Sequence, residues 1–277
     1  MTRDNDPAVR AAAVEALGRI ADPRVAPAVR NAFTDGNAEV RARAAEATSR
    51  LGDVGGIPQL VALLQPKFSE GERVAAASAL GFIGDERVGQ PLVGLLDDES
   101  EPVRRAAASA LARLGLHGRE LLSRQAKFEG AAMVEFLGSL AVARVPAARR
   151  LFEQELAKKD LAGPARFACE VGLYLLGDRS RGTTVLAGAR GERRGANPTL
   201  AMIALIFARD PEGQKTVRAA LRSRNPAMRE SAVLALGVAR PDWAAPLLRE
   251  AAKDRRPGVS LRARVALRWI AAKERAR

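Results

Sequence analysis

The chain has 277 residues and 29.5 kDa, with 4% aromatic residues and a formal net charge of +13. Cys169 and His117 are the single residues of their types, so the sequence excludes an intramolecular disulfide framework and any site that needs two imidazoles. It shows neither a signal-peptide-like start nor the run of about 18 apolar residues that crosses a bilayer, so we expect a cytoplasmic protein without membrane contact.

The charge is unevenly distributed along the chain. Counted from the sequence, residues 1–120 carry 15 Lys and Arg against 17 Asp and Glu, while residues 121–277 carry 30 against 15. An excess of this kind favours an acidic partner or a polyanion on the C-terminal half. Codon bias in a GC-rich gene would also raise the Arg content, but it explains the total better than the asymmetry.

A repeat of 31–32 residues begins almost at the N-terminus. The segments from Pro7, Ala38 and Glu101 look like copies of one unit, and a small residue marks the same position in each copy. These anchors are Ala16, Ala47, Ala79, Ala110, Ala141, Gly172, Ala204, Ala235 and Ala266. A second small residue precedes most anchors by three positions and a Leu or Val usually follows, which predicts a helix A with a close-packing face.

A second apolar stretch follows each anchor and predicts a helix B. Thirteen residues after the anchor stand Val29, Leu60, Leu92, Val185, Val217 and Leu248, and turn-forming residues follow six positions later. Two helices at a fixed period indicate a stacked solenoid. We therefore expect an all-α, α/α superhelical solenoid of about nine repeats, one domain over 1–277, with a ninth repeat reduced to a terminal helix near 259–275.

The repeat resembles the HEAT-like repeats first associated with phycobilisome lyases. Their pattern, D-x-x-P-x-V-R-x-x-A-A-x-A-L-G-x-I-G-D, is matched closely at 6–22, 99–115 and 224–237. The resemblance implies an α/α superhelix with a binding or scaffolding role. It also implies that an Arg six positions before the anchor and an Asp six positions after it form a ladder of hydrogen bonds between repeats.

The remaining reactive or acidic residues have structural interpretations. Cys169 occupies a small inward-facing position, so we expect it to be packed rather than nucleophilic. His117 lies in a turn without a metal-ligand partner at suitable spacing. The acidic run 97–101 precedes a helix A, where it suits the positive helix terminus.

No catalytic site can be identified. Deoxyhypusine hydroxylase, an enzyme with a similar fold, needs several His-Glu metal pairs, and HEAT-like DNA glycosylases use a tryptophan-rich cleft. Phycobilin lyase activity is not excluded by residue type. We expect a chain that is not an enzyme, without cofactor, metal or small-molecule substrate.

A row of cations is predicted on helix B of the C-terminal repeats. Positions fourteen and eighteen after the anchor are neighbours on one helix face, and from the fourth repeat onward they hold mainly basic residues. The expected partner-binding residues are Arg124, Lys159, Arg190, Arg218, Arg222, Arg249 and Lys253. We expect B helices to line the concave side, which would make these residues a ridge.

The fourth and fifth repeats depart from the pattern, because Ser123 and Gln154 replace the apolar residue of helix B. The departure indicates a bend, a softer joint or a ligand-facing centre.

The predicted function is a protein-interaction scaffold that binds an acidic protein or peptide segment on the basic concave face of the C-terminal half. The alternative is sequence-independent nucleic-acid binding through phosphates. Scarce aromatic residues disfavour single-strand binding by stacking.

Overall fold

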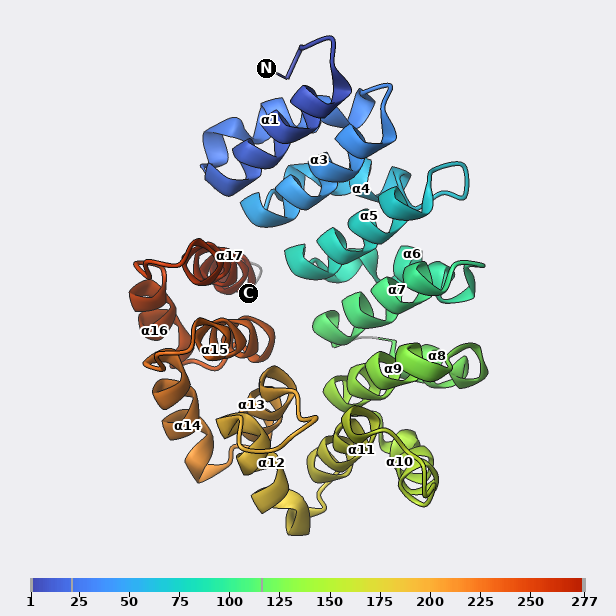
Figure 1. The fold of residues 1–277 in the computed structure, drawn as a ribbon, viewed down its shortest axis with the longest axis vertical. Coiled ribbons are helices and arrows are strands. Elements are labelled where there is room, and N and C mark those ends of the chain that lie inside the picture. Colours follow the sequence, from blue (N-terminus) through green and yellow to red (C-terminus); the bar gives the residue numbers. More distant parts are fainter. Residues whose placement is uncertain (1, 21, 116, 276–277) are drawn as a thin grey trace. The chain divides into compact units, whose positions relative to one another are not determined.

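The computed structural model describes residues 2–20, 22–115 and 117–275, and it divides into two compact units. Unit 1 covers residues 1–117 and unit 2 covers residues 118–277. Seventeen α-helices and no strand are found in the described residues (Figure 1). The predicted all-α solenoid is confirmed, while its description as one domain stays a prediction.

The odd-numbered helices are the A helices, and each contains one of the predicted anchors. Those of unit 1 are α1 (Pro7–Ile20), α3 (Ala38–Leu51), α5 (Glu70–Ile83) and α7 (Glu101–Leu114). Those of unit 2 are α9 (Gly130–Ala143), α11 (Gly163–Leu175), α13 (Pro198–Phe207), α15 (Pro226–Ala239) and α17 (Pro257–Arg275). The last helix, α17, covers the stretch near 259–275 where a terminal helix is expected.

The even-numbered helices are the B helices, which are shorter and often flanked by 3-10 turns. They are α2 (Ala26–Asn31), α4 (Ile57–Ala62), α6 (Gly89–Gly94), α8 (Gly118–Leu122), α10 (Arg149–Leu156), α12 (Gly182–Arg190), α14 (Pro211–Leu221) and α16 (Ala244–Ala251).

The boundaries of the A helices follow from local side-chain chemistry. Asn37 accepts hydrogen bonds from two backbone amides at the start of α3, and Ser69 forms a capping box with Glu72 at the start of α5. Gly52 and Gly84 end these two helices in the left-handed conformation, which a residue without Cβ adopts at little cost.

The small anchors allow successive A helices to approach closely. Ala47 and Ala110 are fully buried, and a Cβ added to Gly81 would lie 2.5 Å from the Cα of Ala110. The residue two positions after one anchor therefore packs directly on the next anchor. Ala16 is exposed, because no A helix precedes it in unit 1.

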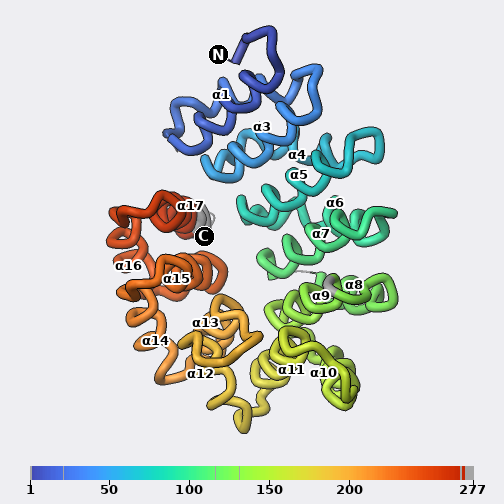
Figure 2. Tube along the Cα trace, in the orientation of Figure 1, coloured from blue at the N-terminus to red at the C-terminus, as the bar shows by residue number. Residues whose placement is uncertain are grey.

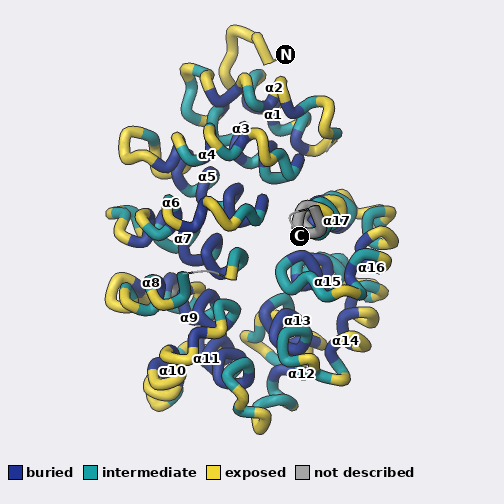
Figure 3. The backbone as a smooth tube through the Cα atoms, turned by 180° about the vertical axis from the view of Figure 1, so that it is seen from behind, coloured by how far each residue is buried: buried dark blue, intermediate teal, exposed yellow. Residues whose placement is uncertain are grey.

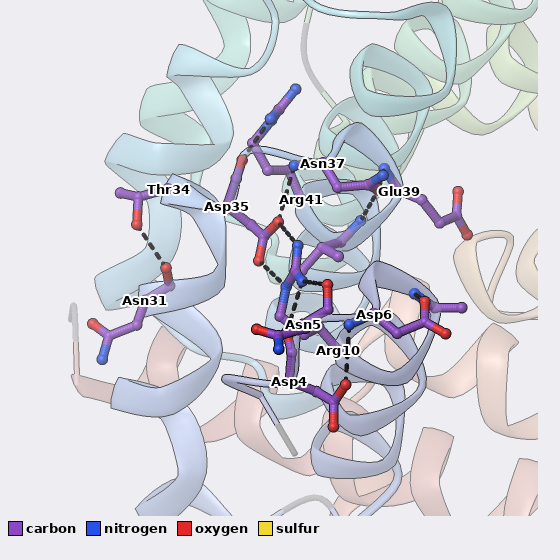
Figure 4. A network of polar contacts seen from close by, with 12 residues as sticks. Asp4, Asn5, Asp6, Arg10, Asn31, Thr34, Asp35, Asn37, Glu39 and Arg41 are labelled. Atoms are coloured by element: carbon purple, nitrogen blue, oxygen red, sulfur yellow. Dashed lines mark hydrogen bonds and ion pairs between the residues drawn. The ribbon is translucent and has the colours of Figure 1, made fainter.

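The recurring Arg residues bind the end of their own hairpin. Arg10 is paired with Asp35 at 2.8 Å, as shown in Figure 4, and two later hairpins repeat this contact. Arg73 is 3.0 Å from Asp98, and Arg229 is 2.7 Å from Asp254. The hydrogen bond from Arg10 lowers the pKa of Asp35.

The same guanidinium groups also reach the preceding hairpin. Nη1 of Arg73 donates to the carbonyl of Phe68 at 2.7 Å, and Nη1 of Arg229 donates to the carbonyl of Ser223 at 2.9 Å. Each Arg thus bridges helix-end carbonyls and a carboxylate, and links neighbouring hairpins. The ladder exists, but its acidic members are not the ones predicted.

The Asp residues six positions after the anchors have another role. Asp22, Asp53 and Asp85 cap the 3-10 turns that lead into the B helices, each accepting from the backbone amide two residues later. They do not bind the Arg residues six positions before the anchors. Asp53 also accepts from Arg30 of the preceding B helix at 2.7 Å.

The fourth and fifth repeats differ by a shift in register. Helices α8 and α10 each begin eight residues after their anchors, whereas α6 begins ten residues after its anchor. Leu121 of α8 and Phe152 of α10 are buried two positions earlier than expected, and Leu151 is buried beside Phe152. Ser123 and Gln154 are exposed.

Unit 2, taken by itself, is a curved double layer. Its A helices lie on the inner side of the curve and its B helices lie on the outer side (Figures 1 and 2). The expectation that B helices line the concave side is therefore wrong for this unit. Residues of the outer layer include many exposed positions, most visibly on α10 (Figure 3).

Candidate functional site

Four of the seven predicted binding residues lie just after a B helix rather than on it, and two of these, Arg124 and Lys159, belong to the fourth and fifth repeats. Arg124 follows α8 and donates to the carbonyl of Glu120 at 3.0 Å, while Lys159 lies in the turn after α10. The positions paired with them, Phe128 and Glu155, are buried. The register shift explains this outcome, and it removes Arg124 and Lys159 from any row formed by helical neighbours.

The other five predicted residues lie at the C-terminal ends of three successive B helices. Arg190 ends α12, Arg218 lies on α14 with Arg222 directly after its end, and Arg249 lies on α16 with Lys253 shortly after it. All five are exposed on the outer layer of unit 2. We refer to these five residues as the cationic row.

Most of the cationic row is unpaired. Among the described residues, Arg190 is the one member of the row in an ion pair, with Glu212 at 3.7 Å, and Glu212 is shared with Lys215 at 3.4 Å. No ion pair links Arg218, Arg222, Arg249 or Lys253 to a carboxylate of the described residues.

Asp254 lies beside the row but does not neutralise it. Its carboxylate is held by Arg229, and the hydrogen bond from this guanidinium lowers the pKa of Asp254. The carboxylate therefore remains charged and engaged, which leaves the cations nearby without a partner.

A shallow groove lies on each side of α14. The α12/α14 groove has a volume of about 260 Å³ and is lined by Ala189, Arg190, Glu212, Lys215, Thr216, Ala219, Ala220, Ser223 and Met228. The α14/α16 groove has a volume of about 190 Å³ and is lined by Arg218, Leu221, Arg222, Leu247, Glu250, Ala251, Lys253 and Asp254.

The size and chemistry of both grooves suit side chains of a macromolecule. Their volumes are below the roughly 300–1,000 Å³ typical of small-molecule sites. Each combines an apolar floor with a cationic rim. Lys215 and the floor residues were missed by sequence analysis, because no periodicity shows which side of α14 faces a gap between helices.

The surroundings of Cys169 do not favour a reactive thiol. Its side chain is fully buried, and burial raises the pKa of the thiol to about 12, which disfavours the nucleophilic thiolate. In the acidic run, Ser100 caps α7 and Asp98 is bound to Arg73, as the capping interpretation requires. The described residues contain no group of three His, Cys, Asp or Glu able to hold a metal.

Comparison with known proteins supports the repeat assignment. The family model for HEAT repeats matches residues 1–70 and 57–124. No curated protein sequence matches the chain. Among the described residues, no helix has the length and apolar character needed to cross a membrane.

Solved structures with a similar fold are helical repeat proteins. A chain of the complex of CpcE and CpcF of phycocyanin lyase from Nostoc sp. PCC7120 matches with a TM-score of 0.60 and 16% identity, over 90% of this chain and 94% of that one. Human deoxyhypusine hydroxylase matches with a TM-score of 0.37 and 19% identity, over 92% and 99%. A designed armadillo repeat protein gives 0.31 and 17%, over 88% and 99%.

Proposed function

Starting from a HEAT-like repeat protein, we propose that this chain is an interaction scaffold whose cationic row binds an acidic protein segment. The observation that carries the proposal is the exposure of four unpaired cations on α14 and α16. Arg218, Arg222, Arg249 and Lys253 cap no buried group and neutralise no carboxylate of the described residues.

The fold gains little from this arrangement: Arg218 and Arg249 lie in the last turns of α14 and α16, where the helix dipole favours a cation by about 0.3–1 kcal/mol, and mutual repulsion offsets part of that gain. Successive packed helices are about 8–10 Å apart, so equivalent charges on α14 and α16 repel each other by a few tenths of a kcal/mol in water. Helix propensity does not require basic residues there, since neutral formers such as Gln serve equally well. A partner with several carboxylates would turn this repulsion into attraction.

We propose a binding role rather than catalysis. The likeness to the phycocyanin lyase complex extends to the fold alone at 16% identity. The single thiol, Cys169, is buried inside the solenoid, and the two grooves beside the cationic row combine charged side chains with apolar surface.

Charge reversal provides the direct test. Arg218, Arg222, Arg249 and Lys253 are all replaced by Glu, and a matched control reverses Arg119, Arg150, Arg209 and Arg264, which are exposed elsewhere on unit 2. Both variants lower the formal net charge from +13 to +5, because each of four substitutions removes two charges.

The probes are a fluorescent Glu-rich peptide and a short DNA duplex, measured at physiological salt. We expect the row variant to bind the peptide at least tenfold more weakly than the parent and the control to retain most of its affinity. Equal losses in both variants would show that only overall charge matters. Tighter binding of DNA than of peptide, with a steep dependence on salt, would favour the nucleic-acid alternative.

A further inference from the structure

The two grooves beside the cationic row lie on opposite sides of one helix, α14. The floor of the α12/α14 groove contains buried Ala189 and Ala220 and the half-buried, adaptable side chain of Met228. The floor of the α14/α16 groove contains Leu247 and Ala251. Both grooves are small, at about 260 and 190 Å³, and the pair suggests a segment that uses both.

We infer that the acidic segment is an amphipathic α-helix lying across α14, with two apolar side chains seven residues apart that enter the two grooves. This inference rests on the proposed function and adds the form of the partner. The occupant is a protein helix with carboxylates between and beyond its two apolar anchors.

The spacing follows from helix dimensions. One helix separates the grooves, and a packed helix occupies about 8–10 Å, so the anchors must be about 10 Å apart. Seven residues of an α-helix rise about 10.5 Å and turn almost two full circles, which places both anchors on one face. An extended strand covers this distance in about three residues, and its side chains then point to opposite faces.

The exposed cations of the row indicate that the partner carries acidic residues between its two apolar anchors. Partner residues three and four positions after the first anchor face the crest of α14, where Lys215, Arg218 and Arg222 are exposed. Residues beyond the second anchor face Arg249 and Lys253. Carboxylates at these positions would meet cations that no described carboxylate neutralises, apart from the contact of Lys215 with Glu212.

The grooves also contain carboxylates, and these restrict which residues of the partner can be acidic. Glu212 lies between Arg190 and Lys215, and Glu250 lines the α14/α16 groove. They disfavour acidic residues at the anchor positions themselves. The partner pattern is therefore apolar at the grooves and acidic over the crest, rather than uniformly acidic.

Two peptides of about 18 residues test the spacing. They have the same composition, rich in Glu and with two Leu, but the Leu residues are seven positions apart in one and five apart in the other. We expect the first to bind about tenfold more tightly by fluorescence anisotropy, and to gain helical circular dichroism on binding, because only its anchors share one face.

Neutral substitutions test the grooves without changing charge. Ala219→Gln narrows the α12/α14 groove and Ala251→Gln narrows the α14/α16 groove. The matched control is Ala28→Gln, at an exposed position of α2. For each groove variant, the affinity for the seven-residue-spaced peptide should exceed that for the five-residue-spaced peptide by about threefold or less. The temperature of thermal unfolding should be unchanged. The control should preserve the full advantage.

The outcomes separate this inference from the proposed function. If the charge-reversed row variant loses both peptides but spacing and groove substitutions have no effect, the row binds acidic segments and the helical partner is wrong. If the row variant binds both peptides as well as the parent does, the proposed function and this inference are both wrong.

Discussion

Arg209 offers a sharp test of how the A helices end. It follows α13 with a φ of 52°, in the position where α3 and α5 are followed by glycines with positive φ. The left-handed conformation costs a residue with a Cβ about 1–2 kcal/mol, while glycine raises the entropy of the unfolded chain by about 0.4–1 kcal/mol. We therefore expect Arg209→Gly to be more stable than Arg209→Ala by about 0.5–1 kcal/mol.

The same pair of substitutions should have the opposite order inside a helix. Arg218 is exposed within α14, where glycine is about 1 kcal/mol less favourable than alanine. Both pairs remove the Arg side chain, so the loss of charge cancels within each comparison. The difference between Gly and Ala should change sign between the two positions.

Urea unfolding followed by far-UV circular dichroism measures both differences. With a slope of about 1–3 kcal/mol per molar urea, the midpoints should differ by about 0.2–1 M. The difference between the two midpoints reports a difference in stability where the paired variants have the same slope of unfolding free energy against urea concentration. An Arg209→Ala variant as stable as Arg209→Gly would refute the argument that the conformation at this position is strained.

Three further predictions concern stability. Cys169→Ala should cost at most about 1–2 kcal/mol and Cys169→Leu about 1–3 kcal/mol by overpacking, and equal denaturant midpoints for the two would contradict tight burial. Gly81→Ala should destabilise by about 1–3 kcal/mol because its Cβ would meet Ala110, whereas Gly94→Ala, with open space around it, should stabilise slightly; the same sign for both would contradict the close packing. Arg229 lowers the pKa of Asp254 in the folded protein, so the ionised carboxylate stabilises the fold at pH values above its unfolded-state pKa, which is about 4. This stabilisation is lost as the pH falls through the folded-state pKa. Arg229→Gln should therefore lower the unfolding temperature at pH 7 more than at pH 3, and a constant difference would argue against the ion pair.

The sequence predicts the A helices well because their signal is redundant. Small anchors recur at 31–32 residues, and each is supported by neighbouring apolar residues and, in several repeats, by an N-terminal Asn or Ser and a C-terminal Gly. Close helix packing requires all these features together. The first two B helices, α2 and α4, carry fewer constraints, since they have only two and one buried residues.

The register shift in the fourth and fifth repeats shows the consequence. Counting from the anchor selects Ser123 and Gln154, but the buried apolar residues of these two helices include Leu121 and Phe152 instead. The apolar pairs Leu121–Leu122 and Leu151–Phe152 were available as a signal. Choosing them would have removed Arg124 and Lys159 from the predicted row.

Other properties depend on three-dimensional arrangement and have no local signature. Both helix layers bury one apolar face, so periodicity alone does not show which layer lies on the inner side of unit 2. The grooves beside α14 likewise arise from the distances between B helices. Their lining residues, such as Ala219 and Ala251, are ordinary helical alanines in the sequence.

Hydrogen–deuterium exchange of the whole chain, with and without a saturating Glu-rich peptide, tests the central claim most directly. The cationic row predicts protection of the C-terminal end of α12 and of α14 and α16, with the other helices unchanged. Protection on the inner A helices of unit 2, or on unit 1, without protection of α14 and α16 would contradict the proposed binding surface.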